Sequence, residues 1–185
     1  LLEIVARLLA AELDEPGLAA LAGSELIGAM DELSPGAAAH IGDLAARGPA
    51  GVEQAAGAYC ALFLVPGGAS PFASAWLGGN PAERGATVTG AVANWMDQLG
   101  VSLASGVWGN LPRDHLAVLL GLRALALTVP PPYGPALAED IRARALGPWV
   151  GRFAAAVCAR TDSPLYRAVA RLAAALAGAD NSVTR

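Results

Sequence analysis

The chain has 185 residues, 55% of them hydrophobic and 15% charged, and its formal net charge is −4. All twelve basic residues are arginine, which excludes mechanisms that need a lysine, such as phosphate binding by a Walker-type loop or Schiff-base chemistry. The net acidic charge disfavours binding to nucleic acid, and the length predicts one domain with a sizeable core.

Charge differs between the two halves of the chain. Residues 1–100 hold eleven acidic residues and three arginines, whereas residues 101–185 hold five acidic residues and nine arginines. An acidic half favours a cationic peptide as partner, although a solvated acidic face gives the same pattern.

The first third of the chain predicts three helices. Apolar residues at positions 1, 5, 8 and 9 recur at helical spacing up to the turn sequence DEPG, residues 14–17. Asp14 can cap a second helix that runs as far as Met30. A weakly patterned segment around His40 follows, and a third helix is predicted over residues 52–65.

Two glycine-rich connections carry large aromatic residues. Residues 65–76, VPGGASPFASAW, hold Phe72 and Trp76, and the second connection holds Trp108. Between them a helix is predicted over residues 81–99, because Asn80 can cap it and Glu83 can close a capping box. Loops normally run over the surface, so bulky rings on them suggest a binding role.

The remaining pattern is also helical. Residues 111–129 are apolar nearly all round and predict a central, buried helix. Its most apolar part, residues 116–129, contains Arg123 and is shorter than the about 20 residues that a bilayer span needs, so no stable membrane insertion is expected. Further helices are predicted from residue 136, through residues 149–157, and over residues 164–177.

No segment shows convincing alternation of apolar and polar residues, so no strand is predicted. The sequence therefore predicts a single all-α domain, residues 1–185, with roughly seven or eight helices around the buried central one. Residues 178–185 are expected to form a flexible tail.

Patterns for catalysis or metal binding are scarce. The two cysteines, Cys60 and Cys158, fall within apolar helical patterns and are expected to be buried free thiols of a cytoplasmic protein. No Cys or His pair has metal-ligand spacing, so no metal site is predicted.

One polar pair stands out at the start of the predicted central helix. Asp114 and His115 are expected in its first turn, where the helix dipole favours a carboxylate, and the carboxylate could help His115 to hold a proton. Simple capping by Asp114, with a partly buried histidine, explains the same residues.

Three motifs, in the same order, carry a resemblance to a known family. Residues 59–76, YCALFLVPGGASPFASAW, are similar to a Y-x-x-L-F segment followed by a Pro/Gly-rich loop that ends in Ser-x-aromatic. Residues 111–125, LPRDHLAVLLGLRAL, are similar to an acidic-Pro-x-Asp-His-Leu helix start. Residues 145–172 are similar to a C-terminal H-L-x-x-W-x-x-x-F pattern that is followed by F-Y-x-x-x-A. The chain thus resembles the TorD/DmsD/NarJ family of cytoplasmic chaperones for molybdoenzymes.

The resemblance has departures. Leu111 stands where the family has an acidic residue, Ala145 where it has the histidine of H-L-x-x-W, and Leu165 where the last motif has a phenylalanine. These changes leave the fold expectation intact but affect the details of client recognition.

The resemblance implies a protein that is not an enzyme, with no catalytic residues, no cofactor and no metal. It implies binding of the twin-arginine signal peptide and of the apoprotein of a molybdenum-containing reductase or dehydrogenase, during cofactor insertion and before export. It also suggests exchange of helices between protomers, so a monomer or a domain-swapped homodimer is expected, and the acidic charge predicts no nucleic-acid partner. By motif match, the residues implied to form the peptide groove are Tyr59, Leu62, Phe63, Phe72, Ser74, Trp76, Asp114 and His115. Trp108 is added as a further candidate for peptide contact.

The physical requirements agree with this assignment. A peptide with arginines followed by an apolar stretch needs an apolar groove beside carboxylates. Phe72 and Trp76 can supply that groove, or they can fold back onto the core. Two alternatives of other classes stay open: a helical enzyme or small-ligand-binding protein centred on Asp114 and His115, and a helical adaptor unconnected with export.

Overall fold

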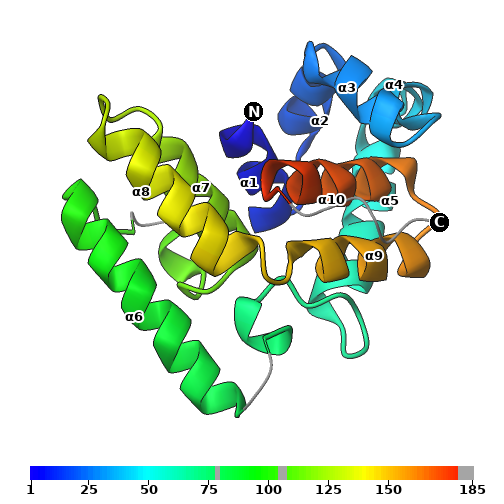
Figure 1. The fold of residues 1–185 in the computed structure, drawn as a ribbon. Helices are drawn as coiled ribbons and strands as arrows, with labels where there is room; N and C mark the ends of the chain where they lie inside the picture. The colour runs from blue at the N-terminus through cyan, green and yellow to red at the C-terminus, as the bar shows by residue number, and fades with distance from the viewer. Residues whose placement is uncertain (78–79, 104–107, 179–185) are drawn as a thin grey trace.

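The structure is a computed structural model that describes residues 1–77, 80–103 and 108–178. Within these residues the regular elements are all helical: ten α-helices, joined in places by π-helical and 3-10 turns (Figure 1). The all-α prediction is confirmed. The number of helices exceeds the expected seven or eight because two segments were not predicted as separate helices.

Helix α1 (Leu2–Ala10) occupies the middle of the molecule, between α7 (Leu116–Ala126) and α10 (Pro164–Leu176) (Figure 1). Its Val5 and Ala6 have no exposed surface. Helix α7 is buried on almost every side, as predicted for the central helix. It begins at Leu116 rather than at residue 111, because the His115 N–H donates to the Pro112 carbonyl in a turn that precedes the helix (3.0 Å).

The predicted second helix is in fact two helices, α2 (Glu15–Ala22) and α3 (Leu26–Leu33). Asp14 caps α2 as predicted, since its carboxylate accepts the Gly17 N–H (2.8 Å). The break comes at Gly23 and Ser24, where the Ser24 hydroxyl donates to the Leu21 carbonyl (2.7 Å). A side chain that satisfies a final carbonyl in this way favours helix termination.

Helix α4 (Ala37–Ala46) occupies the segment whose pattern was too weak to predict a helix. It is followed by α5 (Pro49–Tyr59), which continues into a π-helical turn, η1 (Cys60–Leu64). The two α-helices approach closely at Gly51, where a Cβ would lie 1.9 Å from the Leu44 carbonyl oxygen. Only glycine permits this approach.

Helix α6 (Pro81–Leu99) flanks the body of the molecule beside α7 and α8 (Tyr133–Ile141) (Figure 1). Its Trp95 is buried and donates its indole N–H to the Asp140 carboxylate of α8 (2.8 Å). The Arg144 guanidinium lies over the same ring, 5.6 Å from its centroid. The helix starts at Pro81 as predicted; the predicted capping residue Glu83 has a side chain outside the described part of the structure.

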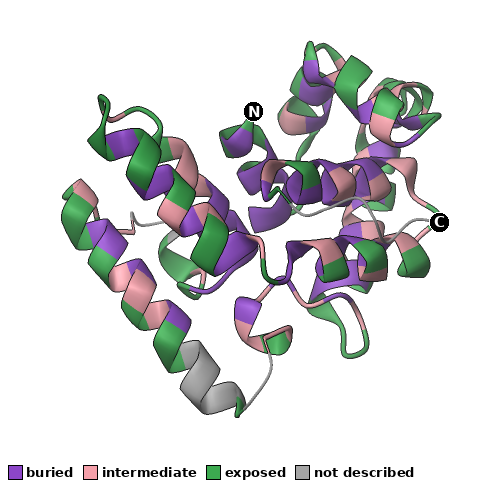
Figure 2. Cartoon of the chain, in the orientation of Figure 1, coloured by how far each residue is buried: buried purple, intermediate pink, exposed green. Residues whose placement is uncertain are grey.

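The C-terminal part forms a helical hairpin. Helix α8 continues into a second π-helical turn, η4 (Arg142–Leu146), and then α9 (Val150–Arg160) packs against α10. Figure 2 shows that buried residues follow the inner faces of these helices and of α1, while the outer faces are exposed. Alanines on the buried face of α10, at positions 168, 170, 173 and 174, let neighbouring helices approach closely.

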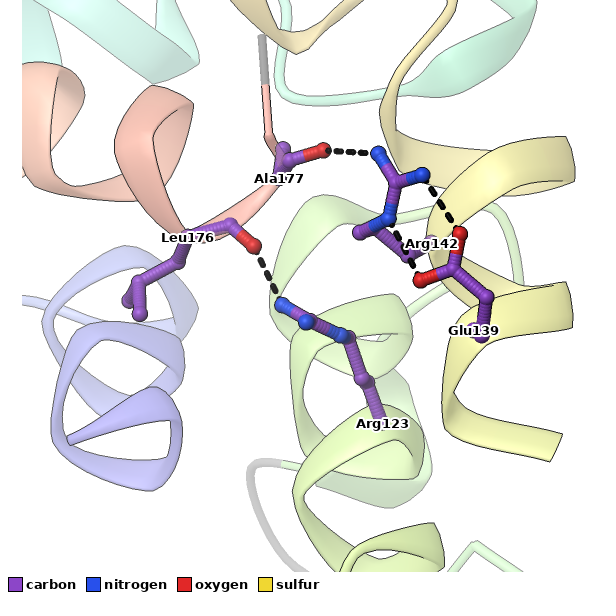
Figure 3. Close-up of polar contacts among 5 residues, drawn as sticks. All are labelled: Arg123, Glu139, Arg142, Leu176 and Ala177. Carbon is purple, nitrogen blue, oxygen red and sulfur yellow. Dashed lines mark hydrogen bonds and ion pairs between the residues drawn. The ribbon is translucent and has the colours of Figure 1, made fainter. Parts of the chain in front are cut away.

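Two arginines hold the end of α10 (Figure 3). Arg123 of α7 donates to the Leu176 carbonyl, and Arg142 donates to the Ala177 carbonyl (3.4 Å) while it pairs with Glu139. Cationic side chains stabilise the negative end of a helix dipole and satisfy its last carbonyls. Among the described residues, none of the helices combines the length and the hydrophobicity that crossing a bilayer requires.

Candidate functional site

The glycine- and proline-rich loop, residues 65–77, folds back against the helices that surround it. The Ala69 N–H donates to the Leu62 carbonyl (2.7 Å) at the start of the loop. Two arginines of α9 hold the loop further along: Arg160 donates to the Gly67 carbonyl (3.1 Å) and Arg152 to the Trp76 carbonyl (2.6 Å). The connection is therefore attached at several points along its length.

Asp114 joins the loop to the start of α7. Its carboxylate accepts the Ser74 N–H (3.1 Å), and its backbone carbonyl accepts the Ala73 N–H (3.0 Å). The prediction that Asp114 lies in the first turn of the central helix is wrong, because that helix starts after His115. The carboxylate instead caps the 3-10 turn of the loop, Ala73–Ala75, from another segment of the chain.

His115 closes the same junction from the other side. Phe72 and His115 form an isolated antiparallel bridge, and their rings meet edge to face with centroids 5.2 Å apart. His115 is the N-cap of α7, and its Nδ1 accepts the Ala117 N–H (3.1 Å). The structure therefore brings Phe72, Ser74, Asp114 and His115 together in one cluster, which we call the loop clip.

Of the two interpretations of His115, the one in which Asp114 helps it to hold a proton is wrong. Its side chain is only 3% exposed, and this burial lowers its pKa to about 4, although the Asp114 carboxylate acts in the opposite direction. A neutral imidazole also agrees with an Nδ1 that accepts a hydrogen bond. The Asp114–His115 pair therefore positions backbone rather than storing a proton at neutral pH.

Tyr59, Phe63 and Trp76 belong to one aromatic cluster, which also includes Phe153 of α9. Trp76 is half-buried, donates its indole N–H to the Ser70 carbonyl (2.7 Å) and meets Phe153 edge to face (6.3 Å). Phe63 stacks on the same Phe153 (6.1 Å) and meets the edge of Tyr59 (5.0 Å). The loop aromatics thus cover the core in part and stay in part accessible.

Tyr59, Leu62 and Phe63 are buried, with 4%, 2% and 8% of their surface exposed. The Tyr59 hydroxyl donates to the Leu9 carbonyl of α1 (3.0 Å), and burial raises the pKa of Tyr59 to about 12. These three side chains therefore support the site from beneath, because the structure offers them little contact with solvent.

Sequence reasoning missed two residues at the surface of this region. Leu64 is the last residue of η1 and is 62% exposed, and Val65 is the first residue of the loop and is 49% exposed. The signal was available, since the apolar run LFLV is longer than one buried helical face requires. The side chain of Trp108 lies outside the described residues.

The two cysteines are less buried than predicted. Both are free thiols, but both are half-buried, and Cys60 donates to the Glu12 carboxylate (2.9 Å). That hydrogen bond raises the pKa of the Cys60 thiol. Among the described residues, no group of three His, Cys, Asp or Glu side chains is arranged to hold a metal ion.

Comparison with models of protein families shows to which family the chain belongs. The model of the nitrate reductase delta subunit family matches residues 28–155, which is more than half of the chain. The chain belongs to the nitrate reductase delta subunit family. Members of this family are molybdoenzyme maturation chaperones rather than catalytic enzymes, so the resemblance to TorD, DmsD and NarJ is confirmed.

The matched region of the family contains the loop clip and the π-helical segment before it, but neither α1 nor α2. Searches of curated proteins and of solved structures found no significant match. Membership in the family implies that the chain binds a molybdoenzyme subunit.

Proposed function

We propose that this protein is a dedicated cytoplasmic chaperone that binds the twin-arginine signal peptide and the apoprotein of one molybdopterin-containing oxidoreductase during cofactor insertion and before export. The observation that carries the proposal is the family match over residues 28–155, because the same region holds the loop clip and the apolar residues around it. An apolar surface next to a carboxylate is what a peptide with arginines and an apolar stretch requires.

The peptide would contact two kinds of surface. Phe72 and Trp76 are half-buried, and the exposed Leu64 and Val65 extend the apolar surface next to them. Rings on a glycine- and proline-rich loop offer a large contact area and adapt by small movements of the backbone. The buried Tyr59, Leu62 and Phe63 would support this surface, and Trp108 remains a proposed contact.

Asp114 is 7% exposed, so a peptide arginine reaches it only when the loop moves. The movement breaks the hydrogen bonds that Asp114 accepts from the Ser74 and Ala73 backbone. A guanidinium then donates to the carboxylate in place of the Ser74 N–H, so that a charged donor replaces a neutral one. Recognition is coupled in this way to opening of the loop clip.

The loop clip favours a chaperone over the alternative of an enzyme centred on Asp114 and His115. The His115 Nδ1 already caps α7, and the Asp114 carboxylate already caps the 3-10 turn of the loop. Both side chains are thereby engaged in backbone positioning, which agrees with the chaperone role of the family.

A binding titration with the leader peptide of the molybdoenzyme encoded beside this gene tests the proposal. We expect saturable binding that weakens when the two adjacent arginines are replaced by alanine, since charged hydrogen bonds contribute about 1.5–3 kcal/mol each. Equal affinity of the two peptides would overturn the recognition claim.

The role of Asp114 is tested with an isosteric variant. Asp114→Asn keeps an oxygen that accepts the Ser74 N–H but removes the charge, so we expect about tenfold weaker binding with little change in thermal stability. Asp97→Asn, at an exposed position of α6, is the matched control and should bind like the wild type. A large loss of stability in Asp114→Asn, with affinity unchanged, would make Asp114 a purely structural residue.

A further inference from the structure

A cavity of about 590 Å³ lies between α1 and α2. This volume falls within the about 300–1,000 Å³ that is typical of ligand pockets. Its lining residues run from Ile4 to Ser24, so they lie outside the region matched by the family and outside the loop clip. The cavity is therefore a feature of the N-terminal helices and separate from the candidate site described above.

The lining of the cavity is mostly apolar. Ile4 and Leu8 contribute from α1, Leu13 from the connecting segment and Leu21 from α2. Ile4 is 41% exposed, and Leu1, one turn earlier, is 56% exposed. The apolar surface thus continues from the cavity onto the exposed face of α1, and contiguous exposed apolar surface is characteristic of interaction sites.

Two carboxylates at the cavity are held in place by hydrogen bonds. The Cys60 thiol donates to Glu12 (2.9 Å), and the Gly17 N–H donates to Asp14 (2.8 Å). Both side chains are exposed, and these hydrogen bonds restrict their positions. Arg7 also lines the cavity, and within the described part of the chain it forms no ion pair with either carboxylate.

The charged residues at the cavity favour an occupant of one charge. The lining holds two carboxylates, Glu12 and Asp14, and one cation, Arg7, and the segment that forms it is acidic, with seven acidic residues in residues 1–32. A negative surface of this kind attracts cationic segments and repels phosphate groups and anionic membranes. The same surface offers an apolar pocket beside the charges, which suits a segment with both basic and apolar side chains.

We propose that the cavity between α1 and α2 is a second docking site, and that it binds a short segment of the client chain in which arginine is followed by aliphatic residues. The inference rests on the proposed function for the nature of the client. Aliphatic side chains enter the pocket formed by Ile4, Leu8, Leu13 and Leu21, and the arginine lies against Glu12 and Asp14. One chaperone then holds the client at two separate places, which raises the overall affinity through the effective concentration of the second segment.

The test uses the full chain and a synthetic peptide with two adjacent arginines ahead of a leucine–alanine run, with a photoreactive group in that run. The variant Glu12→Gln/Asp14→Asn keeps both hydrogen-bond acceptors and removes two charges, so we expect roughly five- to tenfold weaker binding. Arg7→Gln removes the opposing charge and should tighten binding roughly two- to threefold. Asp43→Asn/Glu53→Gln, at exposed positions that do not line the cavity, changes the net charge equally and is the matched control.

Cross-links within residues 4–24, together with opposite effects of the Glu12/Asp14 and Arg7 variants, support the inference. Cross-links confined to the loop clip, with cavity variants that bind like the wild type, overturn it while the proposed function stands. Cavity cross-links that are indifferent to whether the two arginines are adjacent support the cavity site and overturn the twin-arginine claim. No saturable binding, or binding of anionic vesicles instead of the peptide, overturns the second docking site.

Discussion

At the scale of the single residue, His115 links stability to pH. Burial lowers its pKa from 6.5 to about 4, so between these values the unfolded chain binds the proton more readily than the folded chain. The stability contributed by the neutral imidazole is therefore fully present above pH 6.5 and is lost as the pH falls toward 4. We expect the free energy of unfolding to fall by about 3 kcal/mol over this interval through His115 alone, measured by urea unfolding at a series of pH values.

The control for this prediction is His115→Asn. Asparagine accepts the Ala117 N–H at the N-cap equally well but does not titrate. The variant keeps His40, whose pKa is also lowered, chiefly by partial burial, so a smaller acid dependence should remain. If the wild type and the variant lose stability in parallel between pH 6.5 and 4, His115 is not the group responsible.

The pKa of His115 could not be predicted from the residues next to it in the sequence. The adjacent Asp114 suggested a raised pKa, and that Coulombic effect is present in the structure. Desolvation is larger and has the opposite sign, and it depends on packing by Phe72, which lies far away in the chain. Local sequence therefore revealed the neighbouring charge but not the burial that outweighs it.

At the scale of the element, the crossing of α4 and α5 depends on one glycine. A Cβ at Gly51 would lie 1.9 Å from the Leu44 carbonyl oxygen, and that neighbour is backbone and cannot rotate away. We expect Gly51→Ala to lower the free energy of unfolding by about 1–3 kcal/mol. Gly57→Ala, in the same helix with open space around its Cβ, should raise it by about 0.5–1 kcal/mol. If chemical denaturation gives small and equal changes in the free energy of unfolding for both variants, the α4–α5 crossing can shift to accommodate a Cβ at position 51.

Helices with a cap and a regular apolar stripe could be predicted, whereas irregular ones could not. Asp14 and Pro81 mark helix starts that the structure confirms. Helix α4 was missed because its buried face consists of Ala37, Ile41 and Leu44 in a run of alanines that gives little contrast. The π-helical turns were also missed, since their extra residue per turn depends on tertiary packing rather than on local preference.

At the scale of the whole molecule, the sequence named residues for the candidate site but could not give their arrangement. The family resemblance pointed to Tyr59, Phe72, Trp76 and Asp114, and the structure places these residues in adjoining clusters. Their division into a buried support and a half-exposed loop could not be read from spacing, because it arises from long-range hydrogen bonds such as that between Ser74 and Asp114. The cavity at α1 and α2 is also a tertiary feature, and no motif marks it.

The central position of α1 predicts that the N-terminal helix holds the molecule together. It packs against α7 and α10, and its Leu9 carbonyl accepts the Tyr59 hydroxyl (3.0 Å), so it connects the first and last thirds of the chain. Leu9→Ala, at a position that is 1% exposed, should cost about 2–5 kcal/mol of unfolding free energy, because a cavity opens among these helices. Leu1→Ala, the same change at a position that is 56% exposed, should cost less than about 0.5 kcal/mol. Similar midpoints for the two variants in urea unfolding would show that α1 is peripheral to the stability of the fold.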